Sequence, residues 1–217
     1  MVQLAAGKVV FVTGGASGIG RSAAIEFSVE SAAHVVVADI DVEGAEATVV
    51  AMRGPGSSVQ LDVTDDDAVA EAIDQIVNEH GRIDIAFNNA GINDVPHQFH
   101  DLPVERWDRM LDVNLGSVYS CMRHELRHMA SAGRGAIINT SSGAGIVAAP
   151  GLPHYTAAKH GVIGLSKAAA QEYARQGIRV NAVLPGSTDT TMLQNFIAGD
   201  EGMASIIAKS NILGELI

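Results

Sequence analysis

The sequence predicts an α/β protein whose parallel sheet is doubly wound, with helices on both faces. Short runs rich in β-branched residues alternate with longer stretches of helix-forming residues along the whole chain. Nearly half of the 217 residues (47%) are hydrophobic, which allows a sizeable core. Charged residues are few and glycine is abundant, at 23 residues, which favours a compact α/β domain over a disordered or fibrous chain.

Six runs have the length and composition of buried strands. In chain order they are KVVFVT (8–13), HVVVAD (34–39), SVQLD (58–62), IDIAFNN (83–89), GAIINTS (135–141) and IRVNAVLP (178–185). Because parallel strands are joined by right-handed crossovers, we expect the strand order 3-2-1-4-5-6. The carboxyl ends of the strands then share one ligand-binding edge, and the residues expected there are Thr13, Asp39, Asp62, Asn89, Ser142 and Pro185.

Helices are expected between the strands, over residues 19–32, 41–52, 64–81, 103–131 and 153–176. Thr64 is the predicted N-cap of the third helix, and Gly81 ends it. The long fourth helix carries an apolar stripe that we interpret as core or subunit contact: Trp107, Leu111, Leu115, Val118, Met122, Leu126 and Met129. His124 and His128 lack a third ligand at a convincing spacing, so we interpret them as a solvated helix face and expect no metal.

Charge and cysteine content exclude several kinds of partner and location. A net charge of −11 argues against nucleic acid, an anionic membrane or a strongly acidic carrier protein. Cys121 is the only cysteine, so no internal disulfide forms, which fits a reducing compartment. The first residues lack the layout of a signal peptide, and no run reaches 18 apolar residues. We therefore expect a cytoplasmic protein of one domain, residues 1–217.

A glycine loop, TGGASGIG (13–20), follows the first strand. Gly14, Gly18 and Gly20 have the spacing G-x-x-x-G-x-G, a variant of the dinucleotide fingerprint G-x-G-x-x-G. A tight turn and a close approach of backbone to pyrophosphate both require the absence of a Cβ atom. The helix that begins near Ile19 would direct its first amide groups at the phosphates. The loop therefore predicts a dinucleotide site.

Asp39 ends the second strand, 19 residues after Gly20. A carboxylate at this position accepts hydrogen bonds from the adenosine ribose hydroxyls and repels a 2′-phosphate. No Arg or Lys stands between Gly14 and Gly20 to receive such a phosphate. We therefore favour NAD over NADP. The alternative is a solvated acid at the end of a strand.

The stretch HYTAAKHG (154–161) opens the last long helix. Tyr155 and Lys159 are four residues apart and share a helix face. An ammonium beside a phenol favours the phenolate and lowers the pKa of the Tyr, which would make it a proton-transfer group. The alternative is a surface pair without a chemical role.

These motifs in this order resemble the classical short-chain dehydrogenase/reductase family, with a Rossmann-like fold, over residues 7–192. They are TGGASGIG, Asp39, LDV (61–63), NNAG (88–91), Asn114 in DVNLGSVY, the Ser142 of INTSS, Tyr155 with Lys159, and PGSTDT (185–190). The resemblance implies that Tyr155 is the general acid/base and that Lys159 lowers its pKa and holds the nicotinamide ribose. It also implies that Ser142 binds the substrate oxygen, and that Asn114 distorts its helix and holds a water. Neither His154 nor His160 is needed as a base.

The resemblance also implies a set of cofactor-binding residues: Gly14, Ser17, Gly18, Ile19, Gly20, Asp39, Asp62, Val63, Asn89, Ala90, Gly91, Tyr155, Lys159, Pro185, Gly186, Thr188 and Thr190. Members of the family usually continue for about thirty residues, with a further helix and a seventh strand. We therefore expect the chain to be incomplete at its C-terminal end. The family also implies a homodimer or a homotetramer.

We thus predict an oxidoreductase that transfers a hydride between NAD and a secondary alcohol or ketone. The expected pocket segments are mostly small or apolar and favour a modestly sized, uncharged substrate: Asn93–His97, Gly143–Ala149, Leu184 and Thr191–Phe196. One alternative is a 3-oxoacyl carrier-protein reductase that uses NADPH. The other is a non-catalytic NAD-binding sensor module.

Overall fold

The computed structural model describes residues 3–198. It contains one parallel sheet with the order β3-β2-β1-β4-β5-β6, which confirms the predicted topology. The strands are β1 (Val9–Thr13), β2 (His34–Asp39), β3 (Gly56–Gln60), β4 (Ile85–Asn88), β5 (Gly135–Thr140) and β6 (Ile178–Val183). A seventh strand is not part of the described residues.

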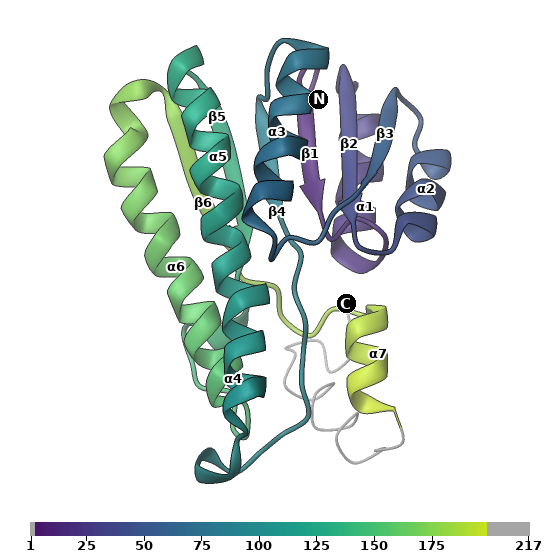
Figure 1. The fold of residues 1–217 in the computed structure, drawn as a ribbon. Coiled ribbons are helices and arrows are strands. Elements are labelled where there is room, and N and C mark those ends of the chain that lie inside the picture. Colours follow the sequence, from purple (N-terminus) through teal and green to yellow (C-terminus); the bar gives the residue numbers. More distant parts are fainter. Residues whose placement is uncertain (1–2, 199–217) are drawn as a thin grey trace.

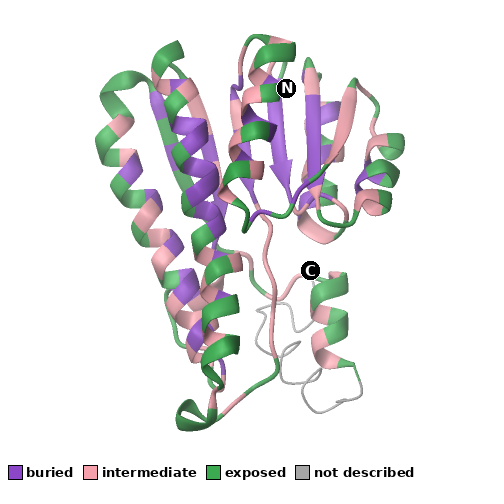
Figure 2. Cartoon of the chain, in the orientation of Figure 1, coloured by how far each residue is buried: buried purple, intermediate pink, exposed green. Residues whose placement is uncertain are grey.

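Helices cover both faces of this sheet (Figure 1). They are α1 (Gly18–Val29), α2 (Val42–Ala51), α3 (Asp66–His80), α4 (Val104–Leu111), α5 (Ser117–Ala132), α6 (Pro153–Tyr173) and α7 (Thr191–Ile197). Side chains alternate along each strand, so β1 sends Phe11 toward α3, α5 and α6, and Val10 and Val12 toward α1 and α2. The buried residues accordingly follow the strands and the inner faces of the helices (Figure 2). None of the described helices combines the length and apolar composition needed to cross a bilayer.

Several predicted boundaries were wrong by one to three residues, and two of these differences have a clear structural reason. β3 starts at Gly56 rather than residue 58, because it pairs with β2 from the register Val35↔Gly56 onward. The N-cap of α3 is Asp65, whose carboxylate accepts a hydrogen bond from Ala68 N at 3.0 Å. The hydroxyl of Thr64 donates instead to the carboxylate of Asp62.

The predicted long helix is continuous in space but is not a regular α-helix throughout. A π-helical turn over Asp112–Gly116 joins α4 to α5, and Asn114 lies at its centre. Such a bulge directs an extra side chain toward the sheet and is frequent at functional sites. The turn places the buried Asn114 near the carboxyl ends of the strands.

The prediction of a solvated face for the two histidines of α5 was wrong for His124. Its side chain is buried, and its Nε2 lies 3.1 Å from Asp66 Oδ1 on α3. His128 is half-buried and makes the equivalent contact with Asp74 at 2.6 Å. Helix α3 packs against α5 and supplies both carboxylates, a tertiary contact that helical spacing alone does not reveal.

A buried polar network links α5 to the middle of the sheet. Asn88 Nδ2 donates to Glu125 Oε2 and to Asn139 Oδ1, at 3.0 Å in both cases. Asn139 in turn donates to Ser166 Oγ on α6, at 2.9 Å. Glu125 is completely buried, and no described residue hydrogen-bonds its Oε1. Burial raises the pKa of Glu125 to about 8, although the Asn88 hydrogen bond opposes this shift.

Glu125→Gln is expected to stabilise the protein more strongly at high pH than at low pH. Folding raises the pKa of Glu125 from its ordinary 4.5 to about 8. Between these two pH values the unfolded chain ionises Glu125 and the folded chain does not, so the wild type loses folding stability as the pH rises from about 4.5 to about 8. Gln keeps the acceptor for Asn88 and stays neutral. Urea unfolding at about pH 5 and about pH 8.5 measures the difference. The exposed Glu71→Gln on α3 is the control, and equal effects of Glu125→Gln at both pH values would contradict the prediction.

Candidate active site

The loop between β1 and α1 requires glycine at all three predicted positions. Gly14 and Gly18 have φ angles of +64° and +53°, in the left-handed region that L side chains avoid. A Cβ atom on Gly20 would lie 2.0 Å from the carbonyl oxygen of Gly14. Helix α1 begins at Gly18, so the amide groups of its first turn face this loop, an arrangement that favours an anion.

Asn89 joins the ends of three strands at the same edge. Its Nδ2 donates to the carbonyl oxygen of Gly14, and its Oδ1 accepts from the hydroxyl of Thr140, both at 3.2 Å. Its backbone N and that of Ala90 donate to Thr13 Oγ1, at 3.0 and 3.2 Å. These bonds hold the glycine loop against the ends of β4 and β5.

Asp39 lies at the end of β2, with its carboxylate directed at the glycine loop. Its Oδ2 accepts from the backbone N of Ala16 at 2.9 Å, and its Oδ1 accepts from the backbone N of Asp41 at 3.0 Å. The carboxylate therefore shapes the loop itself, a role that the sequence did not predict. Each oxygen has a second lone pair with which it could accept a ribose hydroxyl.

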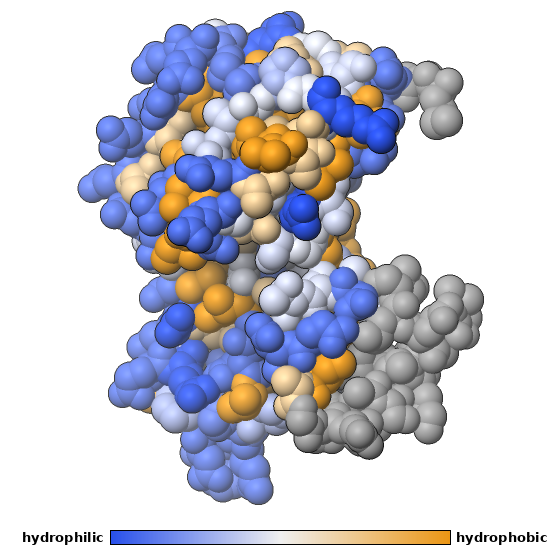
Figure 3. All heavy atoms as spheres, turned by 90° about the vertical axis from the view of Figure 1, so that its right-hand side faces the viewer, coloured by the Kyte–Doolittle hydropathy of each residue, from blue (hydrophilic) through white to orange (hydrophobic). Residues whose placement is uncertain are grey.

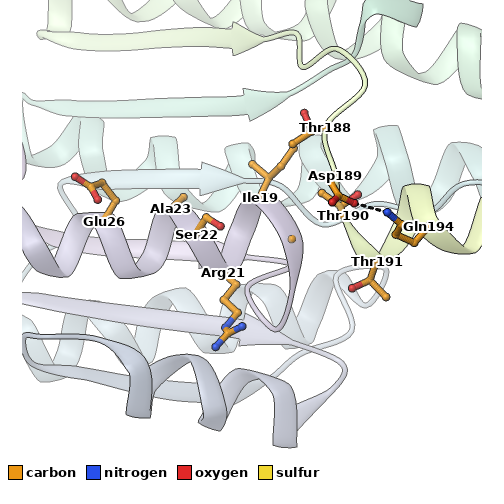
Figure 4. Close-up of a pocket in the computed structure, with 11 residues that line it drawn as sticks. Ile19, Arg21, Ser22, Ala23, Glu26, Thr188, Asp189, Thr190, Thr191 and Gln194 are labelled. Atoms are coloured by element: carbon orange, nitrogen blue, oxygen red, sulfur yellow. Dashed lines mark hydrogen bonds between the residues drawn. The ribbon is translucent and has the colours of Figure 1, made fainter. Parts of the chain in front are cut away.

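A pocket of about 810 Å³ opens between the start of α1 and the segment before α7 (Figures 3 and 4). The volume is within the range of small-molecule and cofactor sites. Its lining includes the predicted residues Gly18, Ile19, Thr188 and Thr190. Together with the glycine cradle, this pocket fits the phosphate region of a dinucleotide.

Seven of the residues that line this pocket had no part in the predicted cofactor site, and three of them show why. Arg21 directly follows the glycine motif, and a motif extended by one residue would have included it. Thr191 and Gln194 belong to α7, which we expected beside the substrate, but the structure places them on this pocket (Figure 4). Strand and helix patterns cannot show how this short helix folds back toward α1.

Tyr155, Ser142 and Lys159 come together at the start of α6. Ser142 lies beside the Tyr155 hydroxyl and acts on the pKa of Tyr155 as a hydrogen-bond partner. Lys159 Nζ lies 5.6 Å from the centroid of the Tyr155 ring and donates to the carbonyl oxygen of Thr140 at 2.9 Å. Pro153 begins the helix, and Tyr155 and Lys159 share a face as their spacing predicts.

The direction of the pKa shift of Tyr155 differs from the expected one. Burial raises the pKa of Tyr155, and the Ser142 hydrogen bond opposes this shift. Burial also lowers the pKa of Lys159 to about 8. The predicted downward shift of the Tyr155 pKa is thus not seen in this structure, because desolvation acts on both side chains and disfavours both charges.

Asn114 holds the chain that follows β4. Its side-chain amide donates to the carbonyl oxygen of Ile92 at 3.1 Å and accepts from the backbone N of Ile92 at 3.2 Å. A Cβ atom on Gly91 would lie 2.7 Å from Asn114 Oδ1 and 3.7 Å from Lys159 Nζ. Asn114, Gly91 and Lys159 are therefore neighbours, as a shared role in one site requires.

The remaining predicted cofactor-binding residues lie around the carboxyl-end edge of the sheet, and they differ in how far their side chains are exposed. Asp62 is exposed, and hydrogen bonds from the backbone and the hydroxyl of Thr64 lower its pKa. The side chain of Val63 is buried in the core, so only its backbone is available to an adenine ring. The carbonyl oxygen of Pro185 accepts from Gly143 N at 3.2 Å, which ties the chain after β6 to the Ser142 loop. Gly186 follows at the surface, and the segment then reaches the pocket at Thr188.

The doubly wound sheet, the glycine cradle and the Ser142–Tyr155–Lys159 group together define a dinucleotide-binding oxidoreductase. The sequence profile of the family described as short chain dehydrogenase matches residues 8–201. The chain therefore belongs to the short-chain dehydrogenase family, as its motifs indicated.

Relatives in this family include dehydrogenases of cyclic alcohols. The chain is 38% identical to a 2,5-dichloro-2,5-cyclohexadiene-1,4-diol dehydrogenase of Sphingobium indicum, over 96% of this chain and 83% of the relative. It is 40% identical to a cyclohexanol dehydrogenase of an Acinetobacter species, over 87% and 76% of the two chains. It is also 39% identical to the 3-oxoacyl-[acyl-carrier-protein] reductase FabG of Thermotoga maritima, over 87% and 77%.

Two solved structures share the fold at similar levels of identity. Levodione reductase superposes with a TM-score of 0.91 and 32% identity, over 95% of this chain and 83% of that chain. ElxO with NADP bound superposes with a TM-score of 0.88 and 35% identity, over 96% and 85%. The chain is thus an oxidoreductase of a family that binds nicotinamide cofactors.

Proposed function

We propose that this protein is an NAD-dependent dehydrogenase of small secondary alcohols, or the reductase of the corresponding ketones, and that cyclic alcohols are its substrate class. The observation that carries the proposal is the contact of Tyr155 with Ser142, with Lys159 next to both the Tyr155 ring and the strand ends. Two relatives are named for their action on cyclic alcohols. The protein is further proposed to form a homodimer or homotetramer in the cytoplasm.

The residues of this site divide the proton chemistry among them. NAD, when bound, would supply the hydride acceptor for the carbinol carbon. Ser142 would hydrogen-bond the substrate oxygen, and Tyr155 would take the hydroxyl proton as general base after its own phenol proton has left, because burial keeps Tyr155 protonated. Lys159 would hold a ribose hydroxyl and, in the neutral form that its pKa of about 8 makes accessible, would accept that phenol proton and release it toward a water near Asn114. In the reverse direction Tyr155 donates the proton to the forming alkoxide.

The surroundings of this site favour an uncharged, apolar substrate. Large apolar side chains are exposed on the segments that we expected at the substrate side, at Val95, Ile146, Val147 and Leu184. Apolar side chains that are exposed side by side near a site commonly mark a binding surface. A cyclic hydrocarbon skeleton with one hydroxyl matches this chemistry.

A panel of secondary alcohols that includes cyclohexanol, assayed with NAD and with NADP, tests the proposal. We expect NAD reduction with the cyclic alcohols, followed by absorbance of the reduced cofactor. Activity only with NADPH and an acyl thioester would instead support the carrier-protein reductase. The similarity to FabG favours this alternative, whereas Asp39 and the net charge of −11 argue against it. Tight NAD binding without turnover of any compound would support a sensor module.

Asp39→Ala is expected to raise the Kd for NAD about tenfold and to reduce the preference for NAD over NADP. The variant loses an acceptor for the ribose hydroxyls and the negative charge that repels a 2′-phosphate. Titration of both cofactors measures the two affinities. Glu43→Ala, which removes an exposed charge from the first turn of α2, is the control. An unchanged ratio of NAD to NADP affinity would show that Asp39 does not select the cofactor.

A further inference from the structure

A cluster of charged and polar side chains lies directly before Tyr155 and has no part in the chemistry described above. His154 precedes Tyr155 in α6, and its Nε2 lies 3.0 Å from Asp94 Oδ2. Arg106 of α4 pairs with the other carboxylate oxygen of Asp94. His97 Nε2 lies 3.9 Å from Asp94 Oδ2. Asp94 is therefore the centre at which three elements meet.

The Asp94–His154 pair of this cluster is largely removed from water, whereas Arg106 is exposed. His154 is completely buried, and the Asp94 side chain is 13% exposed. Burial alone would raise the pKa of Asp94, but the His154 hydrogen bond, the bond from Val95 N and the charge of Arg106 lower it below its ordinary value. The carboxylate is thus held ionised by its partners. A buried pair of this kind contributes little more to folding stability than an apolar pair of similar volume would. We therefore look for its role in how it orients the two segments that it joins.

The cluster connects the segment after β4 to the start of the catalytic helix. Within that segment, the backbone N of His97 donates to the carbonyl oxygen of Gly151, two residues before α6, at 2.8 Å. Gly151 has a φ of +79°, and a Cβ atom there would lie 2.7 Å from Pro96 Cβ. The two segments are therefore in close contact at Asp94 and again at Pro96 and His97.

The same segment is anchored at its other end by Asn114, through the two hydrogen bonds to the backbone of Ile92. The segment is thus tied at Ile92 to Asn114, which neighbours Lys159 through Gly91. At Asp94 it is tied to His154, the residue that directly precedes Tyr155 in α6.

We propose that Asp94 and His154 are positioning residues that hold the segment 92–97 against the first turn of α6, so that this segment forms a wall of the substrate site beside Tyr155. The inference rests on the proposed function, because it assigns the wall to the alcohol that Tyr155 deprotonates. Neither side chain touches the reacting atoms. Misplacement of a substrate wall by about 1 Å weakens catalysis by up to about a hundredfold.

His154→Phe and Asp94→Asn test this proposal by steady-state kinetics. Both variants are expected to raise the KM for cyclohexanol about tenfold or more, with a smaller change in kcat and with the Kd for NAD within about twofold of the wild-type value. His154→Gln keeps a side-chain N–H that can reach Asp94 and is expected to restore most of the lost affinity. The double variant Asp94→Asn with His154→Phe is expected to have a KM for cyclohexanol no higher than that of either single variant, because the two residues act through one hydrogen bond. His160→Phe, on the exposed side of the next turn, is the control.

Hydrogen exchange of residues 92–97 gives a second readout that does not depend on turnover. Faster exchange confined to this segment in the Phe and Asn variants is expected, with the rest of the chain unchanged. The proposal would be overturned if the KM for cyclohexanol and the hydrogen exchange of residues 92–97 were both unchanged. It would also be overturned if the variants lost NAD binding together with exchange protection throughout the chain, because that result marks a general folding defect. If the wild type oxidises no alcohol, the proposed function fails. The exchange measurement then still decides whether the pair holds the segment.

Discussion

Tyr155→Phe is expected to lower kcat by at least about a hundredfold, because general acid/base catalysis by one side chain contributes about 10²–10⁴-fold. The variant retains the ring that packs against Lys159 and loses only the hydroxyl that hydrogen-bonds Ser142. The glycine cradle and Asp39 are unchanged, so NAD affinity should stay within about twofold of the wild-type value. Stopped-flow or steady-state assays of cyclohexanol oxidation, with a separate NAD titration, measure the two quantities.

The matched control for this experiment is Tyr119→Phe. Tyr119 is exposed on α5, so loss of its hydroxyl should leave both kcat and NAD affinity unchanged. Turnover of the Tyr155 variant at the wild-type rate would remove Tyr155 from the mechanism. Equal losses of NAD affinity and kcat would assign it to cofactor binding instead of proton transfer.

Gly20→Ala is expected to weaken NAD binding by about fivefold to a hundredfold, since overpacking of a rigid site costs about 1–3 kcal/mol. The added Cβ would lie 2.0 Å from the Gly14 carbonyl oxygen and 2.7 Å from Asn89 Nδ2. Backbone cannot rotate away as a flexible side chain does, so the glycine loop or α1 must shift. The thermal midpoint without cofactor should fall as well, and calorimetric titration with NAD measures the binding.

Gly164→Ala is the control for this effect. Gly164 is exposed on α6, and an added Cβ there meets nothing within 4 Å outside the backbone of its own helix. Ala is favoured over Gly in a helix by about 1 kcal/mol, so this variant should be slightly more stable and should bind NAD normally. Normal NAD binding by the Gly20 variant would show that the loop is not the cofactor cradle.

The sequence alone was sufficient for the topology, and local patterns in it were enough to propose the chemistry-bearing residues. Buried parallel strands are continuous apolar runs, and their handed crossovers leave few possible orders, so 3-2-1-4-5-6 followed directly. The glycine motif and the Tyr155–Lys159 spacing are local patterns whose geometry depends on neighbouring residues along the chain. Local rules were weaker at boundaries, where the pairing of β3 with β2 and the cap by Asp65 depended on tertiary contacts.

Only the tertiary structure showed which distant side chains contact these residues. No spacing indicates that Asn114 pairs with Ile92, that Asp94 contacts His154 sixty residues away, or that α7 lines the pocket beside Arg21. The pKa shift of Tyr155 likewise runs opposite to the sequence prediction, because burial raises this pKa. Periodicity and motifs depend on the chain near each residue, whereas desolvation and long-range contacts depend on how distant segments pack together.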